Sequence, residues 1–321
     1  MPRTYIKDAL KNIDKKITIF GRAQTIRDHG KVTFIDISDE TGLIQAVTRQ
    51  TNNVNPQDIL EILGTVKKRP ENLVNKNLET GTIEIEIENL KVLSRAQTPP
   101  IPVEGEGTDI NEDLRLKYRY LDLRRERLQK NLRLRHQVAI LARDYLNKEG
   151  FVEVETPYLS QTTPEGSRDF LVPSRMQPGK FYALAQAPQQ YKQLLMLAGF
   201  EKYYQFARAF RDEDMRADRQ LEHTQIDIEM AYVAREDVMN LVENMYKSIA
   251  KSLGRKIQKD PFPVFTYKEA VEKFGADKFD LRQDKDPNTF AFAWVTDFPV
   301  FEKDDEGKLT FAHNPFSAPK P

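Results

Sequence analysis

Residues 204–230 read YQFARAFRDEDMRADRQLEHTQIDIEM and carry the strongest structural signal in the chain. Two runs with a period of two flank a loop of arginines and acids, which is typical of paired β-strands. If the first run is a strand, Ala207, Ala209 and Arg211 share one face. The second run separates apolar residues from acceptors, with Ile226, Ile228 and Met230 on one face and Gln225, Asp227 and Glu229 on the other. The stretch therefore predicts a two-faced hairpin.

The polar face of this hairpin suits a ligand. Two alanines beside Arg211 leave space above the strand, as the floor beneath a bound molecule requires. Three acceptors in a row suit an ammonium group, a ribose or Mg²⁺. The pattern fits a solvated hairpin with surface ion pairs at least as well, because charged runs usually face water. Both interpretations stay open on the residue pattern alone.

Residues 1–105 are rich in β-branched runs bounded by turn residues, which is typical of short strands. Strands are expected at residues 17–26, 32–37 and 43–47, and a short helix at residues 55–63. In residues 81–88 the alternation predicts that Ile83, Ile85 and Ile87 face a core while the glutamates between them face water. Several short strands with one helix predict an all-β barrel of the OB-fold type.

Residues 97–113 contain prolines, glycines and acids, which is typical of a linker. After it, apolar residues recur at helical spacing from Leu128 to Lys148, and Gly150 supplies the stop. Strand and helix patterns then mix to Phe301. We predict the barrel at residues 1–105, a hinge at 106–125 and an α+β domain with an antiparallel sheet at 126–321.

Composition narrows the class of protein. Lys plus Arg and Asp plus Glu each number 49 among 321 residues, so any nucleic acid would bind through local basic patches. The absence of cysteine excludes disulfides and thiolate metal sites. The first ten residues lack the apolar core of a signal peptide, and the longest apolar stretch, near residues 194–200, is too short to span a bilayer. A cytoplasmic protein is expected.

The charged hairpin, from Phe210 to Asp227, closely resembles motif 2 of the class II aminoacyl-tRNA synthetases, in the form found in bacterial-type aspartyl enzymes. Other segments resemble the same family in the same order. They are Arg119–Arg125 at the start of the catalytic domain, Gly150–Pro157 as motif 1, Thr163–Phe170 as the mobile loop, Gln186–Gln193 as the specificity segment, and Trp294–Glu302 with His313–Phe316 as a later strand and loop. The N-terminal third resembles the anticodon-binding OB-fold of these enzymes. The resemblance also implies a homodimer through the Pro157 region.

The resemblance implies an aspartate–tRNA ligase, which forms aspartyl-adenylate from aspartate and Mg²⁺–ATP and transfers the aspartyl group to the tRNA 3′ end. Arg211 is then the catalytic arginine, since a guanidinium grips the α-phosphate and the amino-acid carboxylate together. Lys192 would pair with the β-carboxylate of aspartate, although outside this context it is an ordinary surface lysine. The implied ATP-binding residues are Arg211, Asp212, Glu213, Gln220 and Glu229, with Asp212, like Asp214, alternatively forming an ion pair that holds the loop. The implied aspartate-binding residues are Glu165, Gln189, Lys192, Arg211, Asp227 and His313, and Glu229 is the implied Mg²⁺ ligand.

In the barrel, the resemblance assigns Arg27, Phe34 and Gln45 to the anticodon. An aromatic ring stacks an unpaired base and an amide reads a base edge. Phe34 alternates with Ile35 and Ile37 along its strand, which favours an outward-facing ring over core packing. The loop Asp28-His29-Gly30 indicates relaxed specificity, because relatives that also charge the asparagine tRNA often have histidine there.

The sequence departs from the family in three ways. Motif 3, with its ATP-binding arginine, and the strand carrying a substrate-binding arginine are absent, so we expect a C-terminally truncated chain that is weak or inactive alone. The inserted domain of bacterial members cannot fit between Arg282 and Trp294. Asn314 stands where many relatives have a second histidine.

Three alternatives accompany the aspartate enzyme. Asparaginyl- and lysyl-tRNA synthetases share the architecture, although Lys192 and the segment Arg119–Arg125 favour aspartate. A non-catalytic tRNA-binding or dimerising fragment or paralogue would keep the barrel, but the intact Arg211, Glu213 and Gln220 speak against a degenerate site. An amino-acid ligase without tRNA would lack the barrel that this chain keeps.

Overall fold

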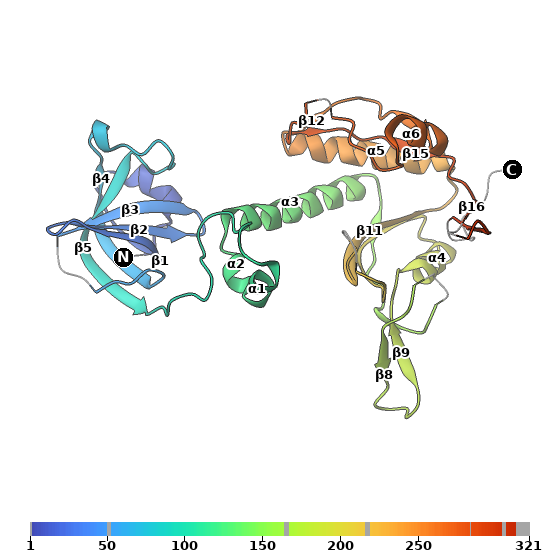
Figure 1. Cartoon of the computed structure of the whole chain (residues 1–321), viewed down its shortest axis with the longest axis horizontal. Coiled ribbons are helices and arrows are strands. Elements are labelled where there is room, and N and C mark those ends of the chain that lie inside the picture. Colours follow the sequence, from blue (N-terminus) through green and yellow to red (C-terminus); the bar gives the residue numbers. More distant parts are fainter. Residues whose placement is uncertain are drawn as a thin grey trace. The chain divides into compact units, whose positions relative to one another are not determined.

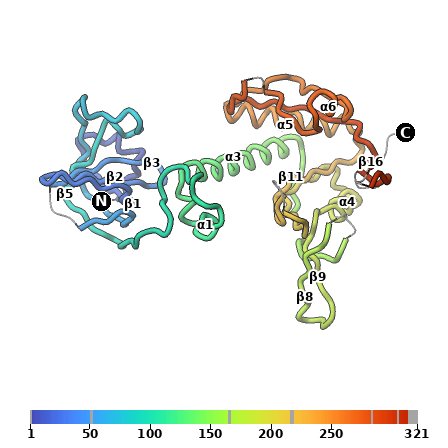
Figure 2. Tube along the Cα trace, viewed as in Figure 1, coloured from blue at the N-terminus to red at the C-terminus, as the bar shows by residue number. Residues whose placement is uncertain are grey.

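The computed structural model describes residues 2–49, 53–163, 167–215, 219–282, 284–303 and 306–312. The chain forms two compact units, Met1–Asn131 and Leu132–Pro321. Figure 1 labels their elements and Figure 2 follows the same trace by residue number.

The first unit contains a closed five-stranded barrel with strand order β1-β2-β3-β5-β4, which confirms the predicted OB-fold. Its strands and flanking 3-10 helices are η1 (Ile6–Asn12), β1 (Lys16–Asp28), β2 (Thr33–Asp39), β3 (Gly42–Thr48), β4 (Ile59–Lys68), η2 (Glu71–Leu73) and β5 (Ile83–Ser94). Isoleucines dominate the core because alternate positions of each strand point inward. On β5, Ile83 and Ile85 are fully buried while Glu86 and Glu88 are exposed, as the alternation predicts.

The short helix predicted over residues 55–63 is wrong. Residues from Ile59 onward form β4, which pairs antiparallel with both β1 and β5. Leu60, Ile62 and Val66 are fully buried on its inner face. The run Ile59-Leu60-Glu61-Ile62-Leu63 has apolar residues at helical as well as strand spacing, so local sequence leaves the element undecided. Long-range pairing with two neighbouring strands decides it.

A buried carboxylate ties the linker to the first unit. Residues 97–110 form no helix or strand, and the linker leads to α1 (Glu112–Lys117) and α2 (Arg119–Asp122). The fully buried Asp122 accepts hydrogen bonds from Arg115 at 3.0 Å, from Arg119 at 2.6 Å and from Arg125 at 2.8 Å. Arg125 also donates to the Pro102 carbonyl at 2.6 Å. The side chains of Asp122 and Arg125 therefore fix the path of the linker.

We expect Asp122→Asn to destabilise the protein by about 3–5 kcal/mol, because it leaves buried guanidinium groups without a counter-charge. Hydrogen bonds from Arg115, opposed by burial and reinforced by Arg125, lower the pKa of Asp122 to about 2. The stabilisation from this carboxylate is thus complete above about pH 4 and is lost as the pH falls towards 2. Urea unfolding of the wild type and of Asp122→Asn at several pH values measures this pH-dependent stabilisation. Asp109→Asn, which changes an exposed carboxylate in the linker, is the control. A stability difference between the wild type and Asp122→Asn that does not shrink below pH 4 would contradict the assignment.

The second unit begins within α3 (Glu126–Lys148), which confirms the predicted helix, and Gly150 at φ +83° ends it in the left-handed region. The remaining elements are β6 (Val152–Glu153), β7 (Leu159–Ser160), β8 (Leu171–Pro173), β9 (Phe181–Leu184), α4 (Gln189–Leu197), β10 (Lys202–Phe210), β11 (Glu222–Met230), α5 (Arg235–Ser252), β12 (Lys256–Ile257), β13 (Val264–Thr266), α6 (Tyr267–Phe274), β14 (Thr289–Phe290), β15 (Trp294–Thr296), β16 (Phe301–Lys303) and β17 (Leu309–Phe311). Across the described residues, no helix is both long and apolar enough to cross a membrane.

The main sheet of this unit has the order β11-β10-β6, with β10 and β11 antiparallel from Lys202 paired with Met230 to Phe210 paired with Glu222. One face of the β10–β11 hairpin packs against α3 and α5. The core on this face joins Ala142, Leu146, Phe151, Tyr204, Leu241, Met245 and Ile249, with Phe206, Ile226, Ile228 and Met230 packed against it. The apolar face predicted from the alternation is therefore the inner face, and the row of acceptors lies on the other.

Candidate active site and nucleic-acid interface

The polar face of the β10–β11 hairpin is set by strand register. Tyr203 is paired with Glu229 and Gln205 with Asp227. Directly opposed residues of an antiparallel pair point to the same side of the sheet. The phenol of Tyr203 and the amide of Gln205 therefore lie beside the carboxylates of β11, on the face turned away from the apolar core.

Lys192 covers this face from α4. Its Nζ lies 2.9 Å from Asp227 Oδ1 and 3.1 Å from Glu229 Oε2, and the residue is only 9% exposed. Burial by itself would lower the pKa of Lys192, but the hydrogen bonds and charges of Asp227 and Glu229 outweigh it and raise the pKa. Lys192 is thus a buried, charged member of an ion triad, not a surface lysine.

A second layer of polar groups lies beneath the triad. The buried amide oxygen of Gln205 accepts hydrogen bonds from Tyr203 Oη at 2.6 Å and from Thr156 Oγ1 at 2.9 Å. Among the described residues, Gln205 Nε2 and Gln225 Oε1 are buried without a partner. Burial raises the pKa of Tyr203, so its hydroxyl stays a donor. Sequence reasoning missed Thr156, Tyr203 and Gln205, although Tyr203 and Gln205 share the period-two face that ends at Arg211.

Arg211 stands at the end of β10, where its backbone N–H donates to the Leu221 carbonyl at 2.8 Å. Within the described part of the chain, no hydrogen bond or ion pair engages its guanidinium. The neighbouring Glu213 accepts a hydrogen bond from Ser167, and this bond, followed by the charges of Arg219 and Arg211, lowers the pKa of Glu213 against the effect of burial. The end of the hairpin therefore presents a guanidinium that has no partner among the described residues, beside a carboxylate whose pKa is lowered.

The loop after β10 is tied to an earlier segment. Asp212 forms an isolated bridge with Arg168, with its N–H donating to the Arg168 carbonyl at 3.0 Å, and its carboxylate lies 4.0 Å from the same side chain. This placement matches the ion-pair alternative for Asp212. The neighbouring Ser167 is held by the buried Gln186, whose Nε2 donates to the Ser167 carbonyl at 3.0 Å. Ser167 and Gln186 were also missed from sequence.

The structure brings some of the predicted residues together and leaves others apart. Lys192, Asp227 and Glu229 meet, and Gln189 begins the helix that carries Lys192. Gln220 is exposed in the loop. Glu165 and His313 lie outside the described residues. Over the ranges that the structure describes, no group of three His, Cys, Asp or Glu side chains has the arrangement of a metal site, so these residues do not by themselves form a Mg²⁺ site around Glu229.

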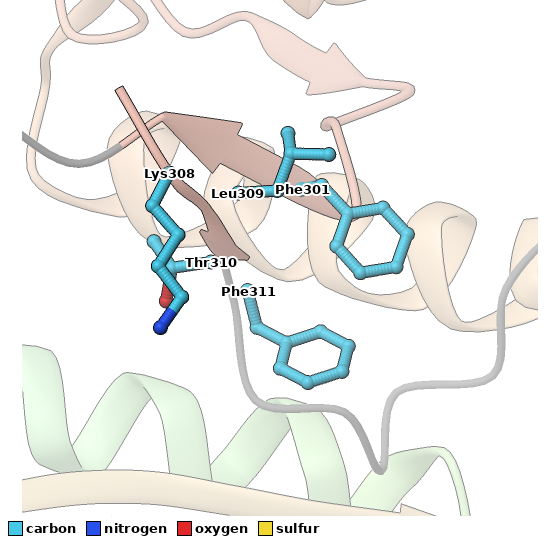
Figure 3. Close-up of a pocket in the computed structure, with 5 residues that line it drawn as sticks. All are labelled: Phe301, Lys308, Leu309, Thr310 and Phe311. Carbon is cyan, nitrogen blue, oxygen red and sulfur yellow. The ribbon is translucent and has the colours of Figure 1, made fainter. Parts of the chain in front are cut away.

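Figure 3 shows a different hollow, about 330 Å³ in volume, along the β16–β17 hairpin. Phe301, Lys308, Leu309, Thr310 and Phe311 line it, and the Phe301 and Phe311 rings stack at 5.1 Å. None of the predicted site residues is among them. The pocket therefore adds no candidate to the polar face.

The outer face of the barrel gathers Arg27, Phe34 and Gln45 on neighbouring strands. Arg27 is paired with Phe34 across β1 and β2, and Gln45 with Asp36 across β2 and β3. Phe34 is half-buried and the His29 ring meets its edge at 5.6 Å. Arg27 donates to Gln45 Oε1 at 3.2 Å. An aromatic ring, an amide and a guanidinium thus share one surface, which is the combination that reads unpaired bases.

Comparison with known proteins identifies the domains that carry the two surfaces. The family model described as tRNA synthetases class II (D, K and N) matches residues 111–321, and that of the OB-fold nucleic acid binding domain matches residues 17–93. The chain belongs to the class II tRNA synthetases. Among curated relatives, this synthetase chain is 46% identical over 313 residues to the aspartate–tRNA(Asp/Asn) ligase of Desulfatibacillum aliphaticivorans, covering 94% of this chain and 52% of the relative.

A second relative, the aspartate–tRNA ligase of Thermosipho africanus, is 50% identical over 280 residues, which are 85% of this chain and 47% of the relative. The synthetase chain spans about half the length of the curated relatives it matches. Among solved structures, the asparaginyl-tRNA synthetase of Pyrococcus horikoshii, in complex with asparaginyl-adenylate, aligns with a TM-score of 0.73 at 23% identity, over 89% of this chain and 70% of that one. The aspartyl-tRNA synthetase of Entamoeba histolytica aligns with a TM-score of 0.70 at 22% identity, over 85% and 62%. These structural alignments support the fold.

Lys192→Met should destabilise this synthetase chain by about 3 kcal/mol at pH 7, because it leaves two neighbouring carboxylates buried without a cation. Thermal unfolding of Lys192→Met and of the control Gln193→Met, on the exposed side of α4, measures this loss of stability. A loss in Lys192→Met no larger than that in Gln193→Met would contradict the triad.

Proposed function

We propose that the protein acts as an aspartate–tRNA ligase, activating aspartate with ATP and transferring it to the 3′ end of tRNA. The observation that carries this proposal is the buried ion triad of Lys192, Asp227 and Glu229 on the polar face of the motif 2 hairpin, β10–β11. The names of the curated relatives support it, since they are aspartate–tRNA or aspartate–tRNA(Asp/Asn) ligases.

The charge of the triad explains why aspartate suits it. One ammonium and two carboxylates leave one net negative charge, which the α-ammonium of an amino acid balances. When that ammonium pairs with Asp227, Lys192 Nζ becomes available to the β-carboxylate of the substrate. Asparagine carries no charge to meet the released lysine, so the same exchange favours aspartate. Gln189, Glu165 and His313 complete the proposed aspartate site.

Arg211 would supply the catalytic charge. Attack of the substrate carboxylate on the α-phosphorus builds negative charge, and a guanidinium that no described residue engages could bind the oxygens. Glu213 and Gln220 are proposed to hold ATP beside it, with Asp212 shaping the loop. Mg²⁺ would enter bound to ATP, with Glu229 as a proposed ligand, and the phosphates would have to complete its coordination.

The barrel would read the anticodon through Phe34, Gln45 and Arg27, with the proposed boundaries at residues 105 and 125 separating barrel, hinge and catalytic domain. Its partners would be the aspartate tRNA and, because of His29, the asparagine tRNA. We propose that this occurs in the cytoplasm.

Relaxed tRNA specificity has a direct test. Wild-type protein should bind the aspartate and asparagine tRNA transcripts alike, and more tightly than an unrelated transcript at one fixed salt concentration. Phe34→Ala should remove most of that preference, since base–aromatic stacking contributes about 1–3 kcal/mol. Leu43→Ala, a half-buried residue on the neighbouring strand, is the control. Equal binding of all three transcripts by the wild type would refute anticodon reading by the barrel.

We further propose a homodimer through the Pro157 region. Several large apolar side chains of α3, β6 and β7 are exposed, among them Leu132, Ile140, Val152 and Leu159. A partner subunit that covered them would remove their apolar surface from water. In sedimentation experiments, we expect the wild type to be a dimer and the Leu132→Glu, Ile140→Glu double variant to be a monomer. A monomeric wild type would rule the dimer out.

A non-catalytic tRNA-binding or dimerising protein is the second candidate, because the closed barrel matches the OB-fold nucleic acid binding domain whether or not the second unit is catalytic. Aspartate-dependent exchange of pyrophosphate into ATP separates the two functions. Exchange that Arg211→Ala abolishes, with Arg208→Ala as the matched control on the same strand, would establish the ligase. Selective tRNA binding with no exchange would establish the second candidate.

A further inference from the structure

Five side chains form a continuous chain of contacts across the outer face of the barrel. Asp36 receives two hydrogen bonds from Arg27, at 2.6 and 3.0 Å. Arg27 donates to Gln45 Oε1 at 3.2 Å, and Gln45 Nε2 donates to Glu84 Oε2 at 3.0 Å. Glu84 lies 3.7 Å from Arg69 Nε. The chain thus runs from β2 through β1, β3 and β5 to the residue that follows β4.

This chain of contacts holds the Gln45 amide at both ends. The two ends of a carboxamide have similar shapes, so only its neighbours decide which end is the donor. Here a guanidinium faces the oxygen and a carboxylate faces the nitrogen. Rotating the amide by half a turn would oppose donor to donor and acceptor to acceptor. Gln45 therefore keeps one N–H and one lone pair in fixed positions for a base edge.

Arg69 controls this arrangement from below the surface. Its side chain is 5% exposed, its Nε donates to the Ile83 carbonyl at 2.9 Å, and its Nη2 is buried without a partner in the described chain. It faces too little solvent to reach a phosphate. Its positive charge instead lies against Glu84, whose side chain is 25% exposed, and holds that carboxylate in place as the acceptor for Gln45.

We propose that Glu84 and Arg69 are positioning residues that orient the Gln45 amide and so set its discrimination of one anticodon base. This inference rests on the proposed reading of the anticodon by the barrel. Arg27 and Asp36 hold the opposite end of the amide, so orientation comes from two oppositely charged pairs placed on either side of it.

The experiment compares the wild-type aspartate tRNA transcript with transcripts altered at one anticodon position each, bound at fixed salt. Gln45→Ala should lower the affinity penalty at one position by roughly tenfold, the order of magnitude of a lost bidentate base contact. Glu84→Gln and Arg69→Met should lower the penalty at that same position and leave the salt dependence unchanged, since neither side chain contacts phosphate.

Non-additivity separates positioning from a structural role. In the Gln45→Ala background, Glu84→Gln and Arg69→Met should cause no further loss of discrimination. Glu88→Gln, the same substitution on an outward-facing residue of the same strand paired with Lys16, is the matched control and should resemble wild type. Additive losses, or a Glu84→Gln protein that discriminates as wild type does, would overturn the inference while Gln45→Ala still reports base reading. Unchanged discrimination in Gln45→Ala would instead refute the proposed anticodon reading together with it. Because Glu84→Gln is nearly isosteric, it provides the test even if Arg69→Met does not fold.

Discussion

The register of the β10–β11 hairpin is the constraint on which the second unit depends. Side chains alternate with a period of two, so a shift of one residue would exchange the two faces completely. In the observed register, Tyr204, Phe206 and Ile228 pack with α3 and α5, while Asp227 and Glu229 face Lys192 of α4. The slipped register would bury two carboxylates in that core and expose the apolar row to water. A single strand register therefore determines both the packing of the core and the geometry of the site.

The ion triad is a costly way to stabilise a fold. Removing an ammonium and two carboxylates from water costs several kcal/mol per ion, and their attraction only roughly repays this. A triad that also leaves one net negative charge is less favourable still. The buried amide nitrogen of Gln205, which has no partner among the described residues, adds a further cost of about 1–3 kcal/mol. Groups that weaken the free protein in this way are expected where a ligand completes them, which is why the polar face rather than the hollow beside Phe301 is the candidate site.

Local sequence determines the parts of the fold that depend on neighbours along the chain. The alternation of Ile226 and Ile228 with Asp227 predicts the two faces of β11, and the spacing after Leu128 with Gly150 predicts α3 and its end. The helix expected over residues 55–63 is wrong because β4 is decided by pairing with β1 and β5, which no local pattern reveals. Lys192 was assigned by resemblance alone, since nothing near it in sequence predicts two carboxylates from a strand much later in the chain. The Asp122 cluster was missed for the same reason, because Arg125 finds another partner in a linker carbonyl 23 residues away.

In both candidate sites, oppositely charged neighbours hold a polar side chain in one orientation. A flexible polar side chain must be held in one orientation before its ligand arrives, or binding has to supply the ordering free energy. Packing holds apolar groups by shape, but the two ends of an amide differ little in shape and strongly in polarity, and a carboxylate presents two equivalent oxygens. Opposite charges on either side are therefore the effective restraint: Arg27 and Glu84 for the Gln45 amide, and Lys192 between Asp227 and Glu229. The two networks differ in their net charge. The barrel network pairs two guanidinium groups with two carboxylates and is neutral, which suits the uncharged base edge proposed for it. The triad is one positive charge short, which suits the charged ligand proposed for it.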